Sequence, residues 1–178
     1  MSYYRIPLVD DEEEVRKGIL RKMDWKKLGF QVAGDAENGE EALEKIEQLK
    51  PDVVMTDIRM PYMDGLTLTS RIRQKYPSMK VLIFSGYDDF EYAQQAIKLN
   101  VTEYILKPVN VEELTEILNR VRENLDEEIE QRRDINLLRE RYRSSLPIIR
   151  EIFLNDLVRG NVDEEEVKPK LEEYGVDI

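Results

Sequence analysis

The stretch VVMTDIRMPYMDG, residues 53–65, runs four uncharged residues into an aspartate and then into a loop that holds a proline and an Asp-Gly pair. A short apolar run bounded by turn residues is typical of a strand that is buried on both faces of a parallel sheet. We therefore interpret residues 53–57 as a strand whose last side chain, Asp57, lies at its carboxyl end.

Similar apolar runs alternate with segments of helical period along the first 122 or so residues. Strands are expected at 6–9, 30–36, 53–57, 80–86 and 103–108, and helices at about 13–24, 38–50, 66–76, 90–100 and 111–124. This alternation predicts an α/β fold, a doubly wound five-stranded parallel sheet with helices on both faces. Pro7 is the exception, because proline is normally excluded from a central strand. We expect irregular pairing there, or the loss of one hydrogen bond worth about 1 kcal/mol.

The composition changes beyond residue 124. Residues 125–178 hold 15 acidic and 9 basic residues and no strand-like run, so we expect a helical extension to a domain that covers residues 1–124. A heptad seam is expected along this helix to about residue 144, through Leu114, Leu118, Val121, Leu125, Ile135 and Tyr142, with interruptions at Glu128, Arg132 and Arg139. Pro147 suits the first turn of a new helix, which predicts a break and shorter helices after it.

Composition excludes several classes of function. The formal net charge of −11 repels phosphate backbones, so this fragment is not expected to bind nucleic acid. The chain has no cysteine and no histidine, which excludes disulfides, thiolate metal sites and histidine-based catalysis. No segment approaches the about 18 apolar residues of a membrane span. We expect a soluble, cytoplasmic protein without a membrane partner.

Polar residues follow four of the five expected strands. In an open α/β sheet, ligands bind outside the carboxyl ends of the strands. The residues at these ends are Asp10, Asp11, Asp57, Ser85 and Lys107, the last followed by Pro108. Three carboxylates in one crevice repel one another unless a hard cation such as Mg²⁺ lies among them. Such a cation leaves room for a phosphoryl group, with Asp57 as covalent acceptor and Lys107 and Ser85 as groups that bind its oxygens.

Each of these residues also has a simpler interpretation. A single aspartate at a strand end is usually a turn former or a helix cap. Asp10 or Asp11 could cap the following helix, Ser85 could belong to a turn with Gly86, and Lys107 could be a solvated loop residue. Their joint placement at matching strand ends favours a shared site.

Four motifs, LVDDE, MTDIRMPYMDG, FSGYDD and YILKP, resemble in order and spacing those of the response-regulator receiver domain of two-component signalling, over about residues 4–124. The resemblance implies a flavodoxin-like strand order, 2-1-3-4-5. It also implies roles for single residues: Asp57 as phospho-acceptor, Asp10 and Asp11 as the acidic pair, Ser85 and Tyr104 as switch residues, Lys107 as the conserved-type lysine, Arg59 as a backbone carbonyl ligand of Mg²⁺, and a cis bond before Pro108.

The resemblance further implies a signalling role. A sensor histidine kinase would donate the phosphoryl group, and the domain would catalyse only its own phosphorylation and slow dephosphorylation. Phosphorylation would change the conformation or dimerisation of the receiver through the fourth helix, fifth strand and fifth helix, or through the helical linker. Residues 85–109 and 154–178 resemble regulators that carry an AraC-type helix-turn-helix output domain, which is absent from these 178 residues.

Three other functions would also use a sheet of this kind or a similar site. A phosphatase of the haloacid dehalogenase class needs a D-x-D pattern after the first strand, and VDDEE lacks that spacing. A flavodoxin-like cofactor-binding module needs a phosphate-binding loop there, whereas DDEEE repels phosphate. A degenerate receiver that never takes phosphate would lack at least one site residue, whereas this sequence has every one of them. The apolar stripe of the heptad seam also has an alternative to self-association, because it could pack on the receiver or on the absent output domain.

Overall fold

The computed structural model describes residues 3–86 and 90–175. Five strands form one parallel sheet in the order β2-β1-β3-β4-β5, as the sequence and the resemblance predict. The strands are β1 (Tyr4–Val9), β2 (Phe30–Ala36), β3 (Val53–Asp57), β4 (Lys80–Ser85) and β5 (Glu103–Leu106). The order reverses between β1 and β3, so the carboxyl ends of these two strands flank the crevice in which this class of sheet binds its ligands.

The helices are α1 (Glu13–Lys22), α2 (Trp25–Leu28), α3 (Gly39–Leu49), α4 (Gly65–Lys75), α5 (Phe90–Lys98), α6 (Val111–Val158) and α7 (Glu164–Glu173). The short helix α2 was not predicted. Its first turn is capped by Asp24, whose side chain accepts a hydrogen bond from Lys27 N, and Gly29 ends it with φ of 86°. A four-residue helix has too few positions to show a helical period in the sequence.

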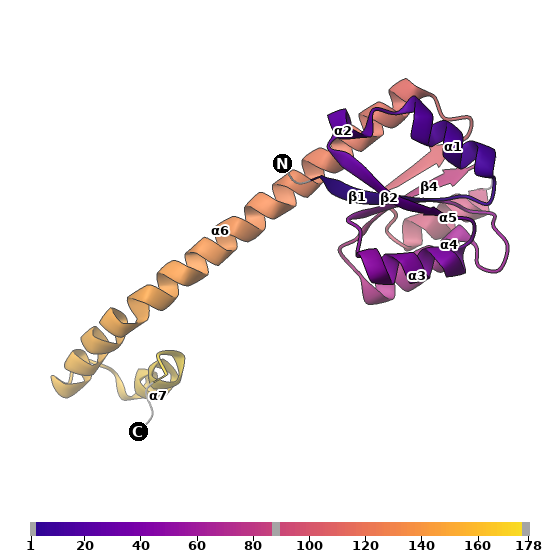
Figure 1. Ribbon diagram of the computed structural model, residues 1–178. Helices are drawn as coiled ribbons and strands as arrows, with labels where there is room; N and C mark the ends of the chain where they lie inside the picture. Colours follow the sequence, from indigo (N-terminus) through magenta and orange to yellow (C-terminus); the bar gives the residue numbers. More distant parts are fainter. Residues whose placement is uncertain (1–2, 87–89, 176–178) are drawn as a thin grey trace. The chain divides into compact units, whose positions relative to one another are not determined.

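Two apolar clusters, one on each face of the sheet, make up the core. One contains Trp25, Leu28 and the first turns of α6, and the other contains residues of α3, α4 and α5. Figure 1 shows α1, α2 and the start of α6 over one face of the sheet and α3, α4 and α5 over the other. β3 is buried along its whole length between the two clusters, which explains its apolar sequence.

Pro7 lies at an irregularity in the sheet. Ile6 pairs with Val32 and Leu8 pairs with Asp35, so β2 places one extra residue opposite Pro7. Gly34, inside this irregular stretch, has φ of 115°, a conformation that favours glycine. The prediction of irregular pairing at Pro7 is therefore confirmed.

The predicted seam along α6 is wrong in its first half. Leu114, Leu118, Val121 and Leu125 are between 0% and 8% exposed and belong to the receiver core. Ile135 and Tyr142 are exposed. The first four residues pack against the sheet, whereas Ile135 and Tyr142 follow the same helical period at a later part of α6.

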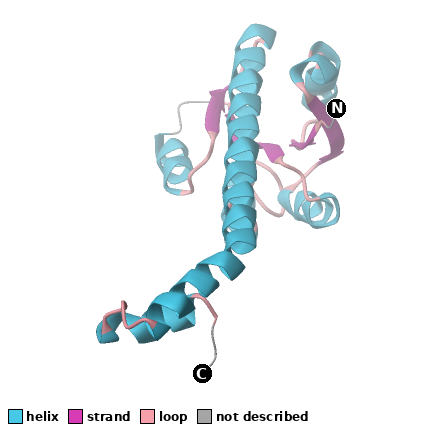
Figure 2. Ribbon diagram, turned by 90° about the vertical axis from the view of Figure 1, so that its left-hand side faces the viewer, coloured by secondary structure: helices cyan, strands magenta, loops and turns pink. Residues whose placement is uncertain are grey.

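The predicted break at Pro147 is also wrong. α6 runs as one helix from Val111 to Val158 with Pro147 in its interior (Figure 2). Proline removes the hydrogen bond that its N–H would donate to the carbonyl of Arg143. Both residues are exposed, so water can bind that carbonyl. The preceding serines also fit a helix, since the Ser144 and Ser145 hydroxyls donate to the carbonyls of Glu140 and Arg141.

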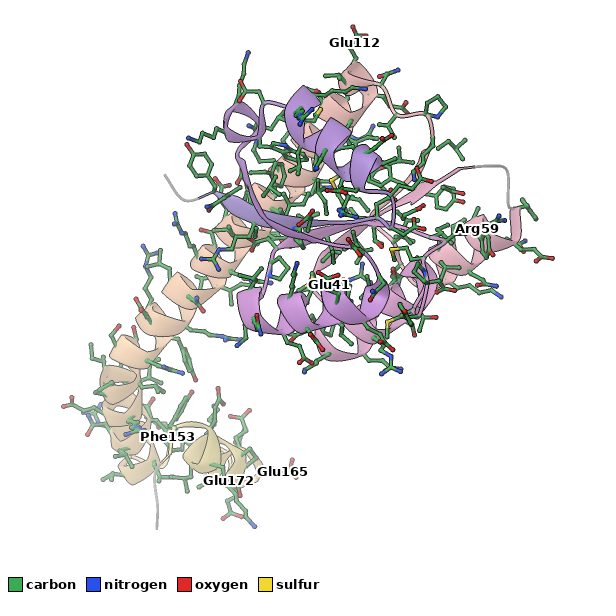
Figure 3. All side chains as sticks on the ribbon, turned by 45° about the vertical axis from the view of Figure 1, so that its right-hand side comes forward. Glu41, Arg59, Glu112, Phe153, Glu165 and Glu172 are labelled. Carbon is green, nitrogen blue, oxygen red and sulfur yellow. The ribbon has the colours of Figure 1, made fainter. Side chains whose placement is uncertain are left out.

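The chain divides into two compact units, Met1–Leu125 and Asp126–Ile178. In the second unit, α7 packs on the last turns of α6, where the rings of Phe153 and Tyr174 lie 5.5 Å apart and Leu171 is buried (Figure 3). Among the described residues, no helix is both long and apolar enough to span a bilayer.

Candidate functional site

Three aspartates gather at the carboxyl end of the sheet. Asp57 is the last residue of β3, and Asp10 and Asp11 follow β1. One carboxylate oxygen from each lies within 4.8 Å of the others. Asp10 and Asp57 are buried, with 4% and 8% of their surface exposed, whereas Asp11 is exposed. The topology thus brings together residues that are 46 positions apart in the chain, from Asp11 to Asp57.

Backbone N–H groups hold the two buried carboxylates in place. Asp10 Oδ1 accepts a hydrogen bond from Glu12 N at 2.9 Å, and Asp57 Oδ1 accepts one from Ile58 N at 2.9 Å. Each carboxylate therefore keeps its second oxygen, Oδ2, for other partners. This arrangement fixes the direction of both side chains before any ligand binds.

Lys107, just after β5, contacts both Oδ2 atoms. Its Nζ lies 3.0 Å from Asp10 Oδ2 and 3.3 Å from Asp57 Oδ2. Its backbone N donates to the Ser85 carbonyl at 2.7 Å, and the Lys107–Pro108 peptide bond is cis. One ammonium group thus faces two carboxylates in a largely buried position, with Asp11 as a third acidic group close by.

The charges in this cluster are not balanced. Burial raises the pKa of the Asp57 carboxyl, and the nearby Asp10 charge raises it further, against the lowering effect of Lys107. Burial lowers the pKa of the Lys107 ammonium, but the hydrogen bond to Asp10 and the charges of Asp57 and Asp10 together raise it. The raised pKa of Lys107 and the contribution of Asp10 to the pKa of Asp57 reflect the excess of carboxylates over ammonium groups, which fits a hard divalent cation with oxygen ligands.

Ser85 and Tyr104 lie on neighbouring strands. Ser85 is the last residue of β4 and is 4% exposed, next to the segment that carries Lys107. Tyr104 pairs with Ile83 and packs against the apolar cluster of the α3–α5 face. Its hydroxyl is buried and has no hydrogen-bond partner among the described residues. Part of the FSGYDD motif, Tyr87 to Asp89, lies outside the described residues.

Arg59 lies in the loop after β3 (Figure 3). Its guanidinium carbon is 5.6 Å from the centroid of the Tyr92 ring on α5, a cation–π contact. Arg59, Asp11 and Asp64 line a shared pocket of about 380 Å³. The Arg59 side chain therefore borders the acidic cluster, on the side of α5.

Gly65 is a site residue that the sequence analysis did not single out. A Cβ built on it would lie 2.0 Å from the carbonyl oxygen of Asp57, so only glycine fits at this position. Its N–H donates to the Ile58 carbonyl at 2.8 Å, which closes the loop after β3. The Asp-Gly pair was interpreted as a turn signal, and that signal does not reveal which backbone the glycine approaches.

Arg16 was also missed. It is 5% exposed, and its Nη1 donates to the Asp10 carbonyl at 2.5 Å while its Nε donates to Asp35 Oδ2 at 3.0 Å. It ties the loop after β1 to the end of β2 and so positions the Asp10 backbone. An arginine on an amphipathic helix is usually solvated, and the sequence carries no signal against that.

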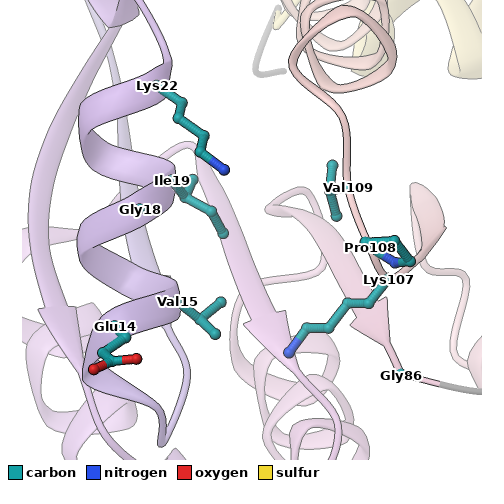
Figure 4. Close-up of a pocket in the computed structure, with 9 residues that line it drawn as sticks. All are labelled: Glu14, Val15, Gly18, Ile19, Lys22, Gly86, Lys107, Pro108 and Val109. Atoms are coloured by element: carbon teal, nitrogen blue, oxygen red, sulfur yellow. The ribbon is translucent and has the colours of Figure 1, made fainter.

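A second pocket, of about 540 Å³, opens beside Lys107. Figure 4 shows Val15, Ile19 and Lys22 of α1 on one side and Lys107, Pro108 and Val109 on the other. The pocket is mainly apolar and its lining includes the lysine that contacts both buried aspartates.

Comparison with known proteins agrees with this geometry. The model of the response regulator receiver domain matches residues 6–119. This chain belongs to that family. The receiver is 40% identical over 118 residues to the transcriptional regulatory protein YesN of Bacillus subtilis, a match that covers 66% of this chain and 32% of YesN. It is 38% identical to HptR of Staphylococcus aureus, over 66% of this chain and 46% of HptR. The matches span less than half the length of these relatives.

Solved structures of receivers resemble the chain closely. The receiver domain of AraT, a response regulator from Geobacillus stearothermophilus, is 41% identical with a TM-score of 0.68, over 72% of this chain and 98% of that one. A chain of the CheX-CheY-BeF₃-Mg²⁺ complex from Borrelia burgdorferi is 25% identical with a TM-score of 0.61, over 66% of this chain and 88% of that one. The chain is thus a response-regulator receiver, a signalling domain of two-component systems.

Proposed function

We propose that this receiver accepts a phosphoryl group on Asp57 from a sensor histidine kinase and thereby controls a transcription-factor output domain. The position of Lys107 carries the proposal, since its ammonium lies 3.0 Å from Asp10 and 3.3 Å from Asp57. Because Lys107 already contacts Asp57 and Asp10, its ammonium can bind an oxygen of a phosphoryl group on Asp57 with little movement.

The acceptor chemistry follows from the positions of the side chains. Asp57 Oδ2 attacks the phosphorus of a phosphohistidine, the new O–P bond forms, and the P–N bond breaks with its electron pair on the imidazole. Asp57 Oδ1 stays on the Ile58 N–H, which keeps Oδ2 directed at the incoming group. Lys107 binds one phosphoryl oxygen and the Ser85 hydroxyl binds another.

The metal site of the proposal consists of Asp10, Asp11, Asp57 and the Arg59 backbone carbonyl. Bound Mg²⁺ would supply positive charge that neutralises the transferring phosphoryl group. The donor set fits, because the three aspartates offer hard oxygen ligands within 4.8 Å of one another. Arg16 contributes by fixing the backbone of Asp10.

In this proposal, Ser85 and Tyr104 change conformation when Asp57 is phosphorylated. Ser85 moves toward the phosphoryl group, and Tyr104 rotates into the space that it leaves. The face of α5, β5 and the start of α6 carries exposed Phe90, Ile97, Leu106 and Val111, which suits it for pairing of two receivers. A shift of this equilibrium from 1:99 to 99:1 needs about 5.5 kcal/mol, within reach of a few charge-assisted hydrogen bonds.

The proposed output rests on the relatives. YesN and HptR are transcriptional regulatory proteins, and 32% and 46% of their lengths are matched. We infer that residues 126–178 link the receiver to a DNA-binding domain of the AraC type. This is a proposal about the whole regulator and not about the receiver by itself.

Mass spectrometry after incubation with acetyl phosphate and Mg²⁺ tests the acceptor. The parent chain should gain the mass of one phosphoryl group, and Asp57→Asn should gain none. Asp52→Asn, a partly exposed aspartate next to β3, is the matched control and should label like the parent. Equal labelling of parent and Asp57→Asn, or no labelling of the parent, would contradict the proposal.

A further inference from the structure

Nine large apolar side chains stand exposed among the described residues of the second unit, and three of them share one face of α6. Ile135, Leu138 and Tyr142 of α6 are 49%, 64% and 46% exposed. They are spaced by three and four residues, so they lie on one face of the helix. A hollow of about 290 Å³ lies among them, bordered also by Arg139 and Arg143.

This hollow has the form of a coiled-coil hole. The residues Ile135, Leu138, Arg139 and Tyr142 are at i, i+3, i+4 and i+7, the four positions that surround a knob from a facing helix. Further along α6, the Phe153 ring packs on the Tyr174 ring, and the Tyr142 hydroxyl donates to Glu173 Oε1 of α7 at 3.4 Å. Ile135, Leu138 and Tyr142 remain exposed despite this hydrogen bond.

Charges beside the face select the partner and its direction. With Ile135 and Tyr142 at position a and Leu138 at d, Glu127 and Asp134 occupy g, and Arg132 and Arg139 occupy e. In a parallel, in-register pair each g residue faces the e residue five positions later in the partner helix. Glu127 then meets Arg132 and Asp134 meets Arg139, each pair occurring twice.

The opposite direction is unfavourable. In an antiparallel pair, e residues face e residues, which would place Arg132 of one helix against Arg139 of the other. All four charged residues are exposed and available at the helix surface. The two arginines that interrupt the apolar seam in the sequence thus take flanking positions in this frame.

We propose that residues 127–145 of α6 form a parallel, in-register coiled coil with a second copy of this chain. Ile135, Leu138 and Tyr142 make its apolar centre, and the Glu127–Arg132 and Asp134–Arg139 pairs fix its direction. The pairing does not require phosphorylation of Asp57, so it can be tested independently of the proposed function.

Cysteine cross-linking tests the direction, because the chain has no cysteine of its own. Gln131→Cys and Ser145→Cys place single thiols at the d positions on either side of Leu138. Under mild oxidation, each variant alone should form a disulfide-linked dimer at least about ten times faster than Glu140→Cys, which lies on the opposite face. Cross-linking only in a mixture of the two variants means an antiparallel pair, and none at all means no pair; either result overturns the proposal.

Light scattering across a concentration series tests the charges. The parent should reach twice its mass of 21.1 kDa, and Arg139→Glu should raise the dissociation constant about tenfold by replacing two attractions with two repulsions. Asp134→Arg combined with Arg139→Glu should restore the parent value. Asp57→Asn should associate like the parent. A parent chain that stays at 21.1 kDa throughout, or a double variant no better than the single one, overturns the proposal.

Discussion

The two apolar stripes of α6 resemble each other in sequence and differ completely in environment. Leu114, Leu118 and Val121 are at most 2% exposed, whereas Ile135, Leu138 and Tyr142 are 46% to 64% exposed. The first stripe lies in the receiver, where the sheet supplies a partner. The second stays exposed, and the Tyr142 hydroxyl alone reaches α7, at Glu173, among the hydrogen bonds of the described residues. A periodic pattern shows which side of a helix is apolar, and the surrounding fold decides what covers it.

The receiver site should be the least tolerant region. Gly65→Ala places a methyl group against the Asp57 carbonyl, so it should lower the free energy of unfolding by about 4 kcal/mol or more. Denaturant unfolding measures this, and labelling by acetyl phosphate should fall in parallel. Gly18→Ala is the control, because no atom lies within 4 Å of its added Cβ in α1. It should stabilise by about 0.5 to 1 kcal/mol. Equal effects of the two changes would mean that the close approach at Gly65 is unimportant.

The first stripe of α6 should behave as core. Leu118 is fully buried, so Leu118→Ala should lower the free energy of unfolding by about 3 kcal/mol through lost burial and the cavity left behind. Unfolding in urea provides the measurement. A loss below about 1 kcal/mol, the size expected for a change at an exposed position, would show that the start of α6 does not belong to the core.

Arg16 tests whether a buried charge supports the acidic site. Arg16→Ala removes the donors to the Asp10 carbonyl and to Asp35, so it should cost about 2 kcal/mol and weaken Mg²⁺ binding. Lys17→Ala, next along α1, breaks only the exposed pair with Glu13 and should cost less than about 0.5 kcal/mol. Thermal unfolding and Mg²⁺ titration compare the two. Unchanged Mg²⁺ affinity in Arg16→Ala would limit its role to stability.

Asp57→Asn should have a smaller effect, of opposite sign. The pKa of Asp57 is raised in the folded state, so the ionised carboxylate costs stability above its unfolded pKa. Its removal should therefore stabilise the metal-free receiver at neutral pH. The gain should vanish as pH falls through the raised pKa, because the parent carboxyl is then neutral as well. Unfolding at several pH values with EDTA checks this, and a loss of stability at neutral pH would contradict it.

The sequence was enough to predict the sheet order and the main site residues, but not several individual contacts or the path of α6. The sheet order and the meeting of Asp10, Asp57 and Lys107 follow from topology, since parallel strands bring their carboxyl ends to one edge. The contacts of Gly65 and Arg16 could not be predicted, because each depends on how a short loop folds back onto the end of a strand, at the carbonyls of Asp57 and Asp10. The path of α6 through Pro147 could not be predicted either, because an exposed helix can lose one hydrogen bond to water.

Leu138→Ala should have the smallest effect on folding, and it compares the two apolar stripes of α6 most directly. Leu138→Ala removes the same side chain as Leu118→Ala from the same helix, at a position that is 64% exposed instead of buried. It should change the free energy of unfolding of the monomer by less than about 0.5 kcal/mol. Unfolding at low protein concentration measures that change, and light scattering at high concentration should show weaker self-association. If Leu138→Ala cost as much as Leu118→Ala in the monomer, the second stripe would already have a partner inside the chain, and no second copy would be needed to cover it.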